Sequence, residues 1–83
     1  MKILYFAWVR QRVGRAEETV SLPPEVTTVG RLIDWLKSRD EAYANAFADL
    51  RVIRAAVNQE IASLDAPLSG AREVAFFPPV TGG

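Results

Sequence analysis

The apolar residues near the start of the chain predict a strand. Residues 2–9 are rich in β-favouring types, and both of their alternating faces are apolar. A strand that is buried on one face only alternates apolar with polar residues. We therefore expect this strand either to lie in the centre of a sheet or to place its outer face against a partner. Its two faces consist of Ile3, Tyr5 and Ala7, and of Leu4, Phe6 and Trp8.

A turn and a second strand are predicted next. Residues 11–16 contain Gly14 and are typical of a turn. The run 17–22 then predicts a strand that pairs with the first in a hairpin. Two prolines follow and end this strand, because proline cannot donate to a strand ladder. One face of the second strand consists of Glu18, Val20 and Leu22.

The middle of the chain predicts one main helix. Thr28 is a suitable N-cap, and the apolar residues after it recur with the spacing of one buried helical face. These residues are Val29, Leu32, Ile33 and Leu36. Residues 38–49 are rich in alanine and carry no strong signal. There we expect the helix end, a loop and a short turn that packs Phe47.

The last third of the chain predicts two strands with a short one between them. Residues 51–58 form the third strand, and the pair Asn58-Gln59 is a turn signal because asparagine tolerates positive φ. A short return through Ile61 and a loop follow. Residues 73–77 form the last strand, which two prolines close. One face of the third strand consists of Ile53, Ala55 and Val57.

This order of elements predicts an α+β fold. Two strands, a helix and three further strands suggest a mixed sheet of about five strands with one main helix across one face. The ubiquitin-like β-grasp fold meets that description. A chain of 83 residues has room for one domain. We expect residues 1–77 to form this domain and residues 78–83 to form an extended, flexible tail that ends in Gly-Gly.

Charge and missing residue types narrow the function. Ten Lys and Arg balance ten Asp and Glu, so no net field attracts nucleic acid or an acidic membrane surface. Without cysteine or histidine there is no disulfide, zinc site, thiol nucleophile or imidazole base. No apolar run approaches the ~20 residues of a membrane helix, so we expect a cytoplasmic protein. Arg10, Arg12 and Arg15 form the only local basic cluster, either a solvated loop or a contact with an acidic partner.

The C-terminal residues suggest an arm that acts outside the domain. Pro78 and Pro79 favour an extended backbone, and Gly82 and Gly83 carry no side chain. The segment from Pro78 onward spans up to roughly 20 Å when fully extended. Such an arm can thread a narrow channel and present a terminal carboxylate to the active site of another protein.

Three segments carry a family resemblance. The run 73–83 closely resembles the C-terminus of the small subunit of molybdopterin synthase, and the segment 55–59 is also similar to that family. A third similarity lies near the start of the chain, in Phe6-Ala7 followed by Val9-Arg10. The resemblance implies a sulfur carrier with a ubiquitin-like fold. In such a carrier an activating enzyme uses ATP to adenylate the terminal glycine, here Gly83, and a sulfur donor converts it to a thiocarboxylate.

The resemblance also implies partners and site residues. The tail would enter the large synthase subunit, within a heterotetramer, and deliver sulfur to a pterin precursor to form the dithiolene of molybdopterin. The carrier would be a recycled substrate without catalytic side chains, metal or bound cofactor. Strand parity places Leu4 and Ala75 on the outer face beside an implied apolar contact patch. That patch consists of Phe6, Ile61 and Phe77, and the inserted tail consists of Pro78, Pro79, Val80, Thr81, Gly82 and Gly83.

Three other functions stay open. A carrier that serves thiamin synthesis shares the fold and the activation, although the paired prolines favour molybdopterin. A modifier that forms isopeptide bonds is a second possibility, although Lys2 and Lys37 are the only lysines through which it could link to itself. The third is an interaction module with an inert tail, which, unlike a carrier, keeps its function when Gly83 is removed.

Overall fold

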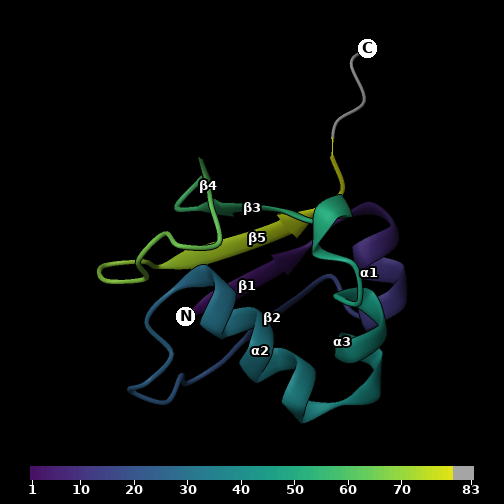
Figure 1. Cartoon of the computed structure of the whole chain (residues 1–83), viewed down its shortest axis with the longest axis horizontal. Coiled ribbons are helices and arrows are strands. Elements are labelled where there is room, and N and C mark those ends of the chain that lie inside the picture. The colour runs from purple at the N-terminus through teal and green to yellow at the C-terminus, as the bar shows by residue number, and fades with distance from the viewer. Residues whose placement is uncertain (80–83) are drawn as a thin grey trace.

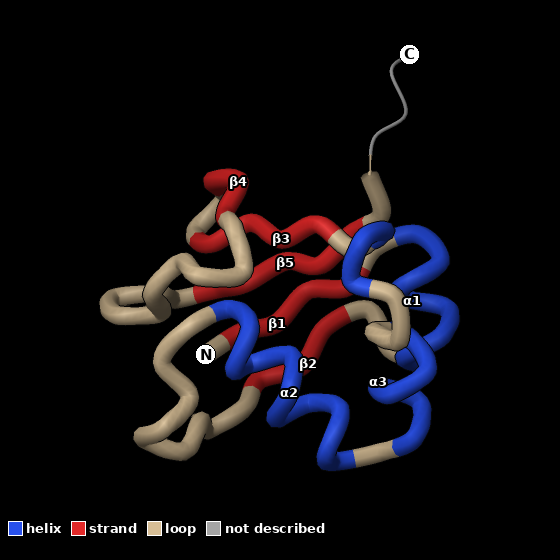
Figure 2. The backbone as a smooth tube through the Cα atoms, viewed as in Figure 1, coloured by secondary structure: helices blue, strands red, loops and turns tan. Residues whose placement is uncertain are grey.

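The computed structural model of the chain describes residues 1–79, which form one mixed sheet of five strands. The strands are β1 (Lys2–Tyr5), β2 (Glu17–Thr19), β3 (Arg54–Val57), β4 (Glu60–Ala62) and β5 (Glu73–Phe77). Their order in the sheet is β2-β1-β5-β3-β4 (Figure 1, Figure 2). β1 pairs with β5 in parallel, and all other neighbouring strands are antiparallel.

The first strand is shorter than predicted. β1 ends at Tyr5, and the residues predicted to continue it form helix α1 (Ala7–Val13). The chain turns out of the sheet at Ala7, whose φ of 53° lies in the left-handed region that most residues avoid. β1 lies between β2 and β5 in the sheet, as expected of a central strand, but only one of its faces, with Ile3 and Tyr5, is buried. The strand prediction for residues 6–9 is therefore wrong.

Helix α1 follows from the spacing of two valines and from a glycine stop. Val9 and Val13 lie one helical turn apart, and both are buried. Gly14 ends the helix with a φ of 89°, and its N–H donates to the carbonyl of Arg10 at 2.9 Å. Gly14 thus marks a turn as predicted, but the residues just before it are helical. The β-favouring composition of the segment outweighed this spacing in the prediction.

The main helix is the one predicted. α2 (Val29–Arg39) lies across one face of the sheet (Figure 1). The hydroxyl of Thr28 accepts the N–H of Arg31 at 3.2 Å, which caps the first turn. All four residues of the predicted stripe are buried: Val29, Leu32, Ile33 and Leu36.

The alanine-rich segment holds a helix where a loop and a short turn were predicted. α3 (Glu41–Ala46) begins after Asp40, whose carboxylate accepts the N–H of Ala42 at 2.8 Å. Its buried residues are Tyr43 and Ala46, and Phe47, which follows the helix, is buried as predicted. These three residues have the spacing of a helical face, so the N-cap aspartate and this short stripe were the available signals.

The remaining boundaries shift, but the order of elements holds. β2 ends at Thr19, short of the predicted end, and the short 3₁₀ helix η1 (Leu50–Val52) replaces the start of the predicted third strand. The turn at Asn58 and Gln59 is confirmed, with φ values of 49° and 71°. Asn58 also accepts the N–H groups of Arg72 and Glu73 through its side-chain oxygen, at 2.8 and 3.2 Å. This residue therefore joins the β3–β4 turn to the start of β5.

The core lies between the sheet and the helices. Figure 1 shows α2 and α3 on one side of the sheet, with α1 at the end toward which β1 and β5 run. Within residues 1–79 no helix covers the opposite face, and none is long and apolar enough to cross a membrane. The fully buried apolar side chains are Ile3, Val9, Val29, Leu32, Ile33, Leu36, Phe47, Val74 and Phe76.

A buried carboxylate connects the sheet to the helices. The hydroxyl of Tyr5 donates to Glu18 at 2.8 Å, and the hydroxyl of Tyr43 donates to the same oxygen. The other oxygen pairs with Arg15 at 3.4 Å and with Arg39 at 3.2 Å. The Glu18 side chain is only 7% exposed. One charge on β2 therefore holds groups from β1, α2, α3 and the turn after α1.

These contacts keep Glu18 ionised. Burial alone would raise the pKa of Glu18, but the hydrogen bonds donated by Tyr43, Tyr5 and Arg39 favour the charged form and lower the pKa below its usual value. Burial and the bond to Glu18 raise the pKa of Tyr5, so its hydroxyl remains a donor. A carboxylate with a lowered folded pKa stabilises the fold above its unfolded pKa. That stabilisation is lost as the pH falls through the folded pKa.

We predict that Glu18→Gln lowers the free energy of unfolding by about 2 kcal/mol at neutral pH, because an amide cannot accept all four donors. Urea unfolding at a series of pH values measures the effect. The difference in free energy of unfolding between Glu18→Gln and the unchanged chain should begin to shrink below pH 4.5, the usual pKa of glutamate. It should vanish as the pH falls through the lower pKa of Glu18 in the folded chain. Glu17→Gln is the control, since Glu17 pairs with Lys2 in solvent. Equal losses for both variants would contradict a structural role for Glu18.

Candidate functional site

Four apolar residues cross the open face of the sheet in one register row. Leu4 of β1 lies opposite Ala75 of β5. Ala56 of β3 lies between Ala75 and Ile61 of β4 and pairs with both. Their neighbours along the strands, such as Ile3, point into the core, so strand alternation directs these four residues outward. Leu4, Ala75, Ala56 and Ile61 are named the apolar row below.

The apolar row is flat in its centre and projects at one end. Ala56 and Ala75 are each 8% exposed, because small side chains between larger neighbours offer little surface. Ile61, on the edge strand, is 75% exposed. Exposed apolar surface next to a packed sheet is typical of a partner contact. The row therefore has the shape of a shallow contact surface with one protruding side chain.

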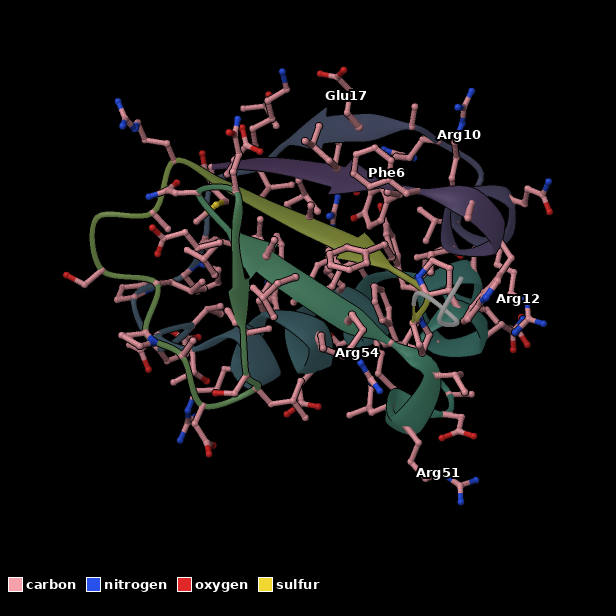
Figure 3. All side chains as sticks on the ribbon, turned by 90° about the horizontal axis from the view of Figure 1, so that it is seen from above. Phe6, Arg10, Arg12, Glu17, Arg51 and Arg54 are labelled. Carbon is pink, nitrogen blue, oxygen red and sulfur yellow. The ribbon has the colours of Figure 1, made fainter. Side chains whose placement is uncertain are left out.

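Two aromatic residues extend the row toward the end of β5. The N–H of Phe6 donates to the carbonyl of Phe76 at 3.0 Å, which keeps Phe6 beside β5 although β1 has ended. Phe6 is 49% exposed, and Phe77 is half-buried. Figure 3 shows Phe6 on the open face, with the main helix behind the sheet. The structure thus places the predicted patch residues Phe6, Ile61 and Phe77 on one face.

The chain leaves the sheet at the same end. Pro78 and Pro79 follow β5 directly, and both are half-buried. Arg54 of β3 lies opposite Phe77 in the register and is exposed. The other predicted tail residues lie outside the described residues: Val80, Thr81, Gly82 and Gly83. Their roles, and the division of the chain into residues 1–77 and 78–83, stay predictions.

The described residues offer a surface rather than an acid–base centre. Residues 1–79 hold no group of His, Cys, Asp and Glu side chains that could bind a metal ion. A hollow of about 480 Å³ beside β4 contains one ionisable group, Glu60, and is otherwise lined by small, apolar and amide residues. A single solvent-facing carboxylate supplies no base with a matched acid. Chemically, this part of the chain can present its open face and the start of its tail to a partner.

Comparison with known proteins identifies the family. The model of the ThiS family matches residues 3–83. This chain belongs to the ThiS family. The ThiS-family chain is 41% identical over 83 residues to the molybdopterin synthase sulfur carrier subunit of Escherichia coli (strain K12). The aligned region covers 100% of this chain and 99% of that relative. The proteins of the same name from Mycosarcoma maydis and Mycobacterium tuberculosis are 34% and 37% identical, covering 100% of this chain and 92% and 96% of the relatives.

Solved structures agree with this assignment. The ThiS-family chain matches SAMP1 from Haloferax volcanii with a TM-score of 0.72 and 29% identity, covering 100% of this chain and 98% of the other. A Pyrococcus furiosus structure described as molybdopterin converting factor subunit 1 matches with a TM-score of 0.70 and 33% identity over 95% of both chains. The family resemblance and the β-grasp fold predicted from the sequence are both confirmed.

The sequence of the ThiS-family chain predicted Leu4, Ala75 and Ile61 of this surface but not Ala56. The pattern of residues 51–58 placed Ile53, Ala55 and Val57 on one face of the third strand. It did not give the register, which pairs Ala56 with Ala75 and Arg54 with Phe77. Pairing between distant strands depends on the turns and on the whole core, so a local pattern does not specify it.

We predict that Ile61→Ala changes the free energy of unfolding by less than about 0.5 kcal/mol, because the side chain is exposed. The matched control is Ile33→Ala, since Ile33 is fully buried on α2 and its truncation should cost about 2–5 kcal/mol. Chemical denaturation of both variants provides the comparison. A loss at Ile61 as large as that at Ile33 would mean that Ile61 serves packing and not the surface.

Proposed function

We propose that the chain is a sulfur carrier in molybdenum cofactor biosynthesis, and that its reactive group is the α-carboxylate of Gly83. An activating enzyme adenylates Gly83, and a sulfur donor converts the adenylate to a thiocarboxylate. The tail then delivers the sulfur to a pterin precursor in the large subunit of molybdopterin synthase, where the dithiolene of molybdopterin forms. Water then cleaves the bond between the acyl carbon and the transferred sulfur, which regenerates the carboxylate of Gly83 for another cycle.

The observation that carries this proposal is similarity over the whole chain to relatives named molybdopterin synthase sulfur carrier subunit, at 41% identity in one case. The similar region includes the ending Phe76-Phe77-Pro78-Pro79 and the four residues after it. Two features of the described residues support it further. The open face carries an apolar row with a protruding Ile61, and β5 leads from this face directly into the prolines.

The first chemical step makes a poor electrophile reactive. A free α-carboxyl has a pKa of about 3.3–3.7, so the group is a carboxylate at neutral pH and repels nucleophiles. In the proposal one oxygen of this carboxylate attacks the α-phosphorus of ATP. The P–O bond to the β-phosphate breaks, and pyrophosphate leaves. The resulting acyl-adenylate has AMP as a good leaving group, which is why ATP is consumed although the carrier itself binds no cofactor.

The second step replaces oxygen with sulfur. A sulfur nucleophile at the level of hydrosulfide attacks the acyl carbon, the C–O bond to AMP breaks, and a proton is released. The product is a thiocarboxylate whose sulfur is itself nucleophilic. Gly82 and Gly83 have no Cβ, so the active sites of both partners can close around the backbone. Docking of the domain raises the effective concentration of this sulfur at the acceptor.

The open face would provide the docking contact. In the proposal the apolar row, together with Phe6 and Phe77, packs against the large subunit, with which the carrier forms a heterotetramer in the cytoplasm. The residues Pro78 to Gly83 then enter the active site of that subunit. The activating enzyme reads the same ending, because the group to be activated is the terminal carboxylate.

A second candidate is a protein modifier. The structure of Haloferax volcanii small archaeal modifier protein 1 is similar, with a TM-score of 0.59 and 25% identity. A modifier would pass its activated glycine to an amine of a target and form an amide. A carrier for thiamin synthesis is a third candidate and differs from the proposal only in the acceptor of sulfur. The nature of the product at Gly83 separates the modifier from both carriers.

We predict that incubation with ATP, a sulfide source and an enzyme that activates carriers of the ThiS family exchanges one oxygen of the chain for sulfur. Intact-mass spectrometry measures the exchange, and fragmentation should confine it to the C-terminal peptide. A variant that lacks Gly83 should show no exchange, because its terminal group is misplaced in the activating site. Omission of ATP is the second control.

An unchanged mass, with an activating enzyme that converts another carrier, would refute the sulfur-carrier proposal. An amide-linked adduct with other proteins, without any thiocarboxylate, would favour the modifier. Transfer of the labelled sulfur to a pterin precursor by the large subunit would identify the acceptor. Transfer only in the presence of thiamin-forming enzymes would favour the third candidate.

We predict that Ile61→Asp weakens binding to the large subunit of molybdopterin synthase at least tenfold, because a carboxylate would be buried in an apolar contact. Isothermal titration calorimetry with the full-length chain measures the affinity. The control is Leu64→Asp, since Leu64 is also exposed and its backbone carbonyl accepts the N–H of Gly30 at the start of α2, away from the open face. Equal affinities for the two variants would exclude the apolar row from the interface.

A further inference from the structure

The arginines of the chain fall into two groups. Arg15 and Arg39 pair with the buried Glu18, and Arg51 pairs with Asp49 at 3.0 Å. These guanidinium charges are matched by carboxylates of the domain. Within residues 1–79 the remaining arginines form no ion pair. They are Arg10, Arg12, Arg31, Arg54 and Arg72.

Arg54 lies where the chain leaves the sheet. It is the cross-strand partner of Phe77, the last residue of β5, and it is exposed. Its Nη1 donates to the carbonyls of Arg51 and Ile53 at 3.1 and 3.0 Å. These bonds hold the side chain in place without neutralising its charge. In the described part of the chain its Nε and Nη2 groups remain available to an acceptor from outside.

Arg10 and Arg12 lie on the other side of the end of β5, where the chain leaves the sheet. Both are exposed on α1, which begins directly after Phe6. The guanidinium of Arg12 lies over the ring of Trp8, 4.6 Å from the ring centre, and such a contact restrains the side chain and keeps its charge. Figure 3 shows Arg10 and Arg12 on one side of the end of β5, and Arg54 on the other.

Acidic residues also border the apolar row. Glu73 pairs with Lys2 in the register at the start of β5, and Glu17 of β2 lies opposite Leu4 and forms an ion pair with Lys2 at 3.3 Å. The apolar row therefore lies between Glu73 and the arginines, and it ends beside Glu17 at β2. A surface with an apolar centre and a charged border has the composition of a protein–protein interface.

We propose that Arg10, Arg12 and Arg54, the arginine collar, bind carboxylates on a partner protein around the entrance that receives the tail. This inference rests on the proposed function and adds the chemistry of the partner surface, an acidic rim beside an apolar contact. Guanidinium groups suit this role because they bind carboxylates through two parallel hydrogen bonds. Two of the three are held before binding, so less side-chain entropy is lost when the rim is engaged.

The position of the collar gives it a directing role. A carboxylate rim that meets charges on both sides of Phe77 fixes the rotation of the domain about the axis of the tail. It also accelerates encounter at low ionic strength, because opposite charges steer association. The sequence cluster Arg10, Arg12 and Arg15 contains only part of this surface, since Arg15 turns to Glu18 and Arg54 comes from β3.

The test uses the full-length chain and the large subunit of molybdopterin synthase. The variant Arg10→Gln/Arg12→Gln/Arg54→Gln removes the collar, and Arg31→Gln/Arg72→Gln removes charges from α2 and from the opposite end of β5. Association rate and affinity are measured over a range of NaCl concentrations. The collar variant should bind about tenfold more weakly at low salt and lose most of the salt dependence of its association rate. The control variant should change less than twofold.

Other outcomes would overturn the inference in distinguishable ways. Equal rates and salt slopes for the unchanged chain and the collar variant would remove the collar from the interface and leave the carrier function intact. An equal effect in the control variant would mean that binding depends on the net charge of the chain and not on the position of the collar. If a single-stranded oligonucleotide binds the unchanged chain but not the collar variant, the collar would bind nucleic acid and not an acidic protein. Thiocarboxylate formation on the unchanged chain, followed by mass, reports on the carrier function independently of the collar, and its failure would refute that function instead.

Discussion

The parallel pairing of β1 with β5 is the interaction on which the other features depend. It joins the first residues of the chain to the last strand and buries Ile3 and Val74 at the centre of the sheet. The open face shares this register, because Leu4 and Ala75 are partners in the same ladder. The bond from Phe6 to the carbonyl of Phe76 continues the pairing beyond β1. The point where the tail leaves is therefore fixed by the paired central strands and not by a loop.

The sequence predicted the elements whose signal is local. The stripe on α2, the cap at Thr28, the turn at Asn58 and the bounds of β5 each follow from a few neighbouring residues. It failed where two signals compete in one segment. Residues 7–13 combine β-favouring side chains with helical spacing, and the burial of Val9 and Val13 favours the helix. Surfaces built from distant strands, such as the apolar row and the arginine collar, need the register and were beyond any local pattern.

Charge is used in two different ways in this small domain. Inside, one carboxylate collects two hydroxyls and two guanidinium groups, so that the sheet, α2 and α3 are tied by a satisfied network. Outside, arginines near the end of β5 are held by a carbonyl pair and an indole ring, which restrain them without cancelling their charge. The first arrangement serves stability, and the second keeps charge available to a partner. Both are arginine-rich, and only the contacts distinguish them.

The apolar row lies on the open face of the sheet, and the arginine collar and the start of the tail lie at the end toward which β5 runs. Under the proposed function, the activating enzyme and the large synthase subunit both take up the same terminal glycine. Their complexes with the carrier are then mutually exclusive, and each sulfur atom delivered requires one complete dissociation and one new encounter. Neither partner can hold the carrier too tightly without slowing the other. In the proposed cycle, the rate of sulfur delivery therefore depends on how quickly each partner releases the carrier.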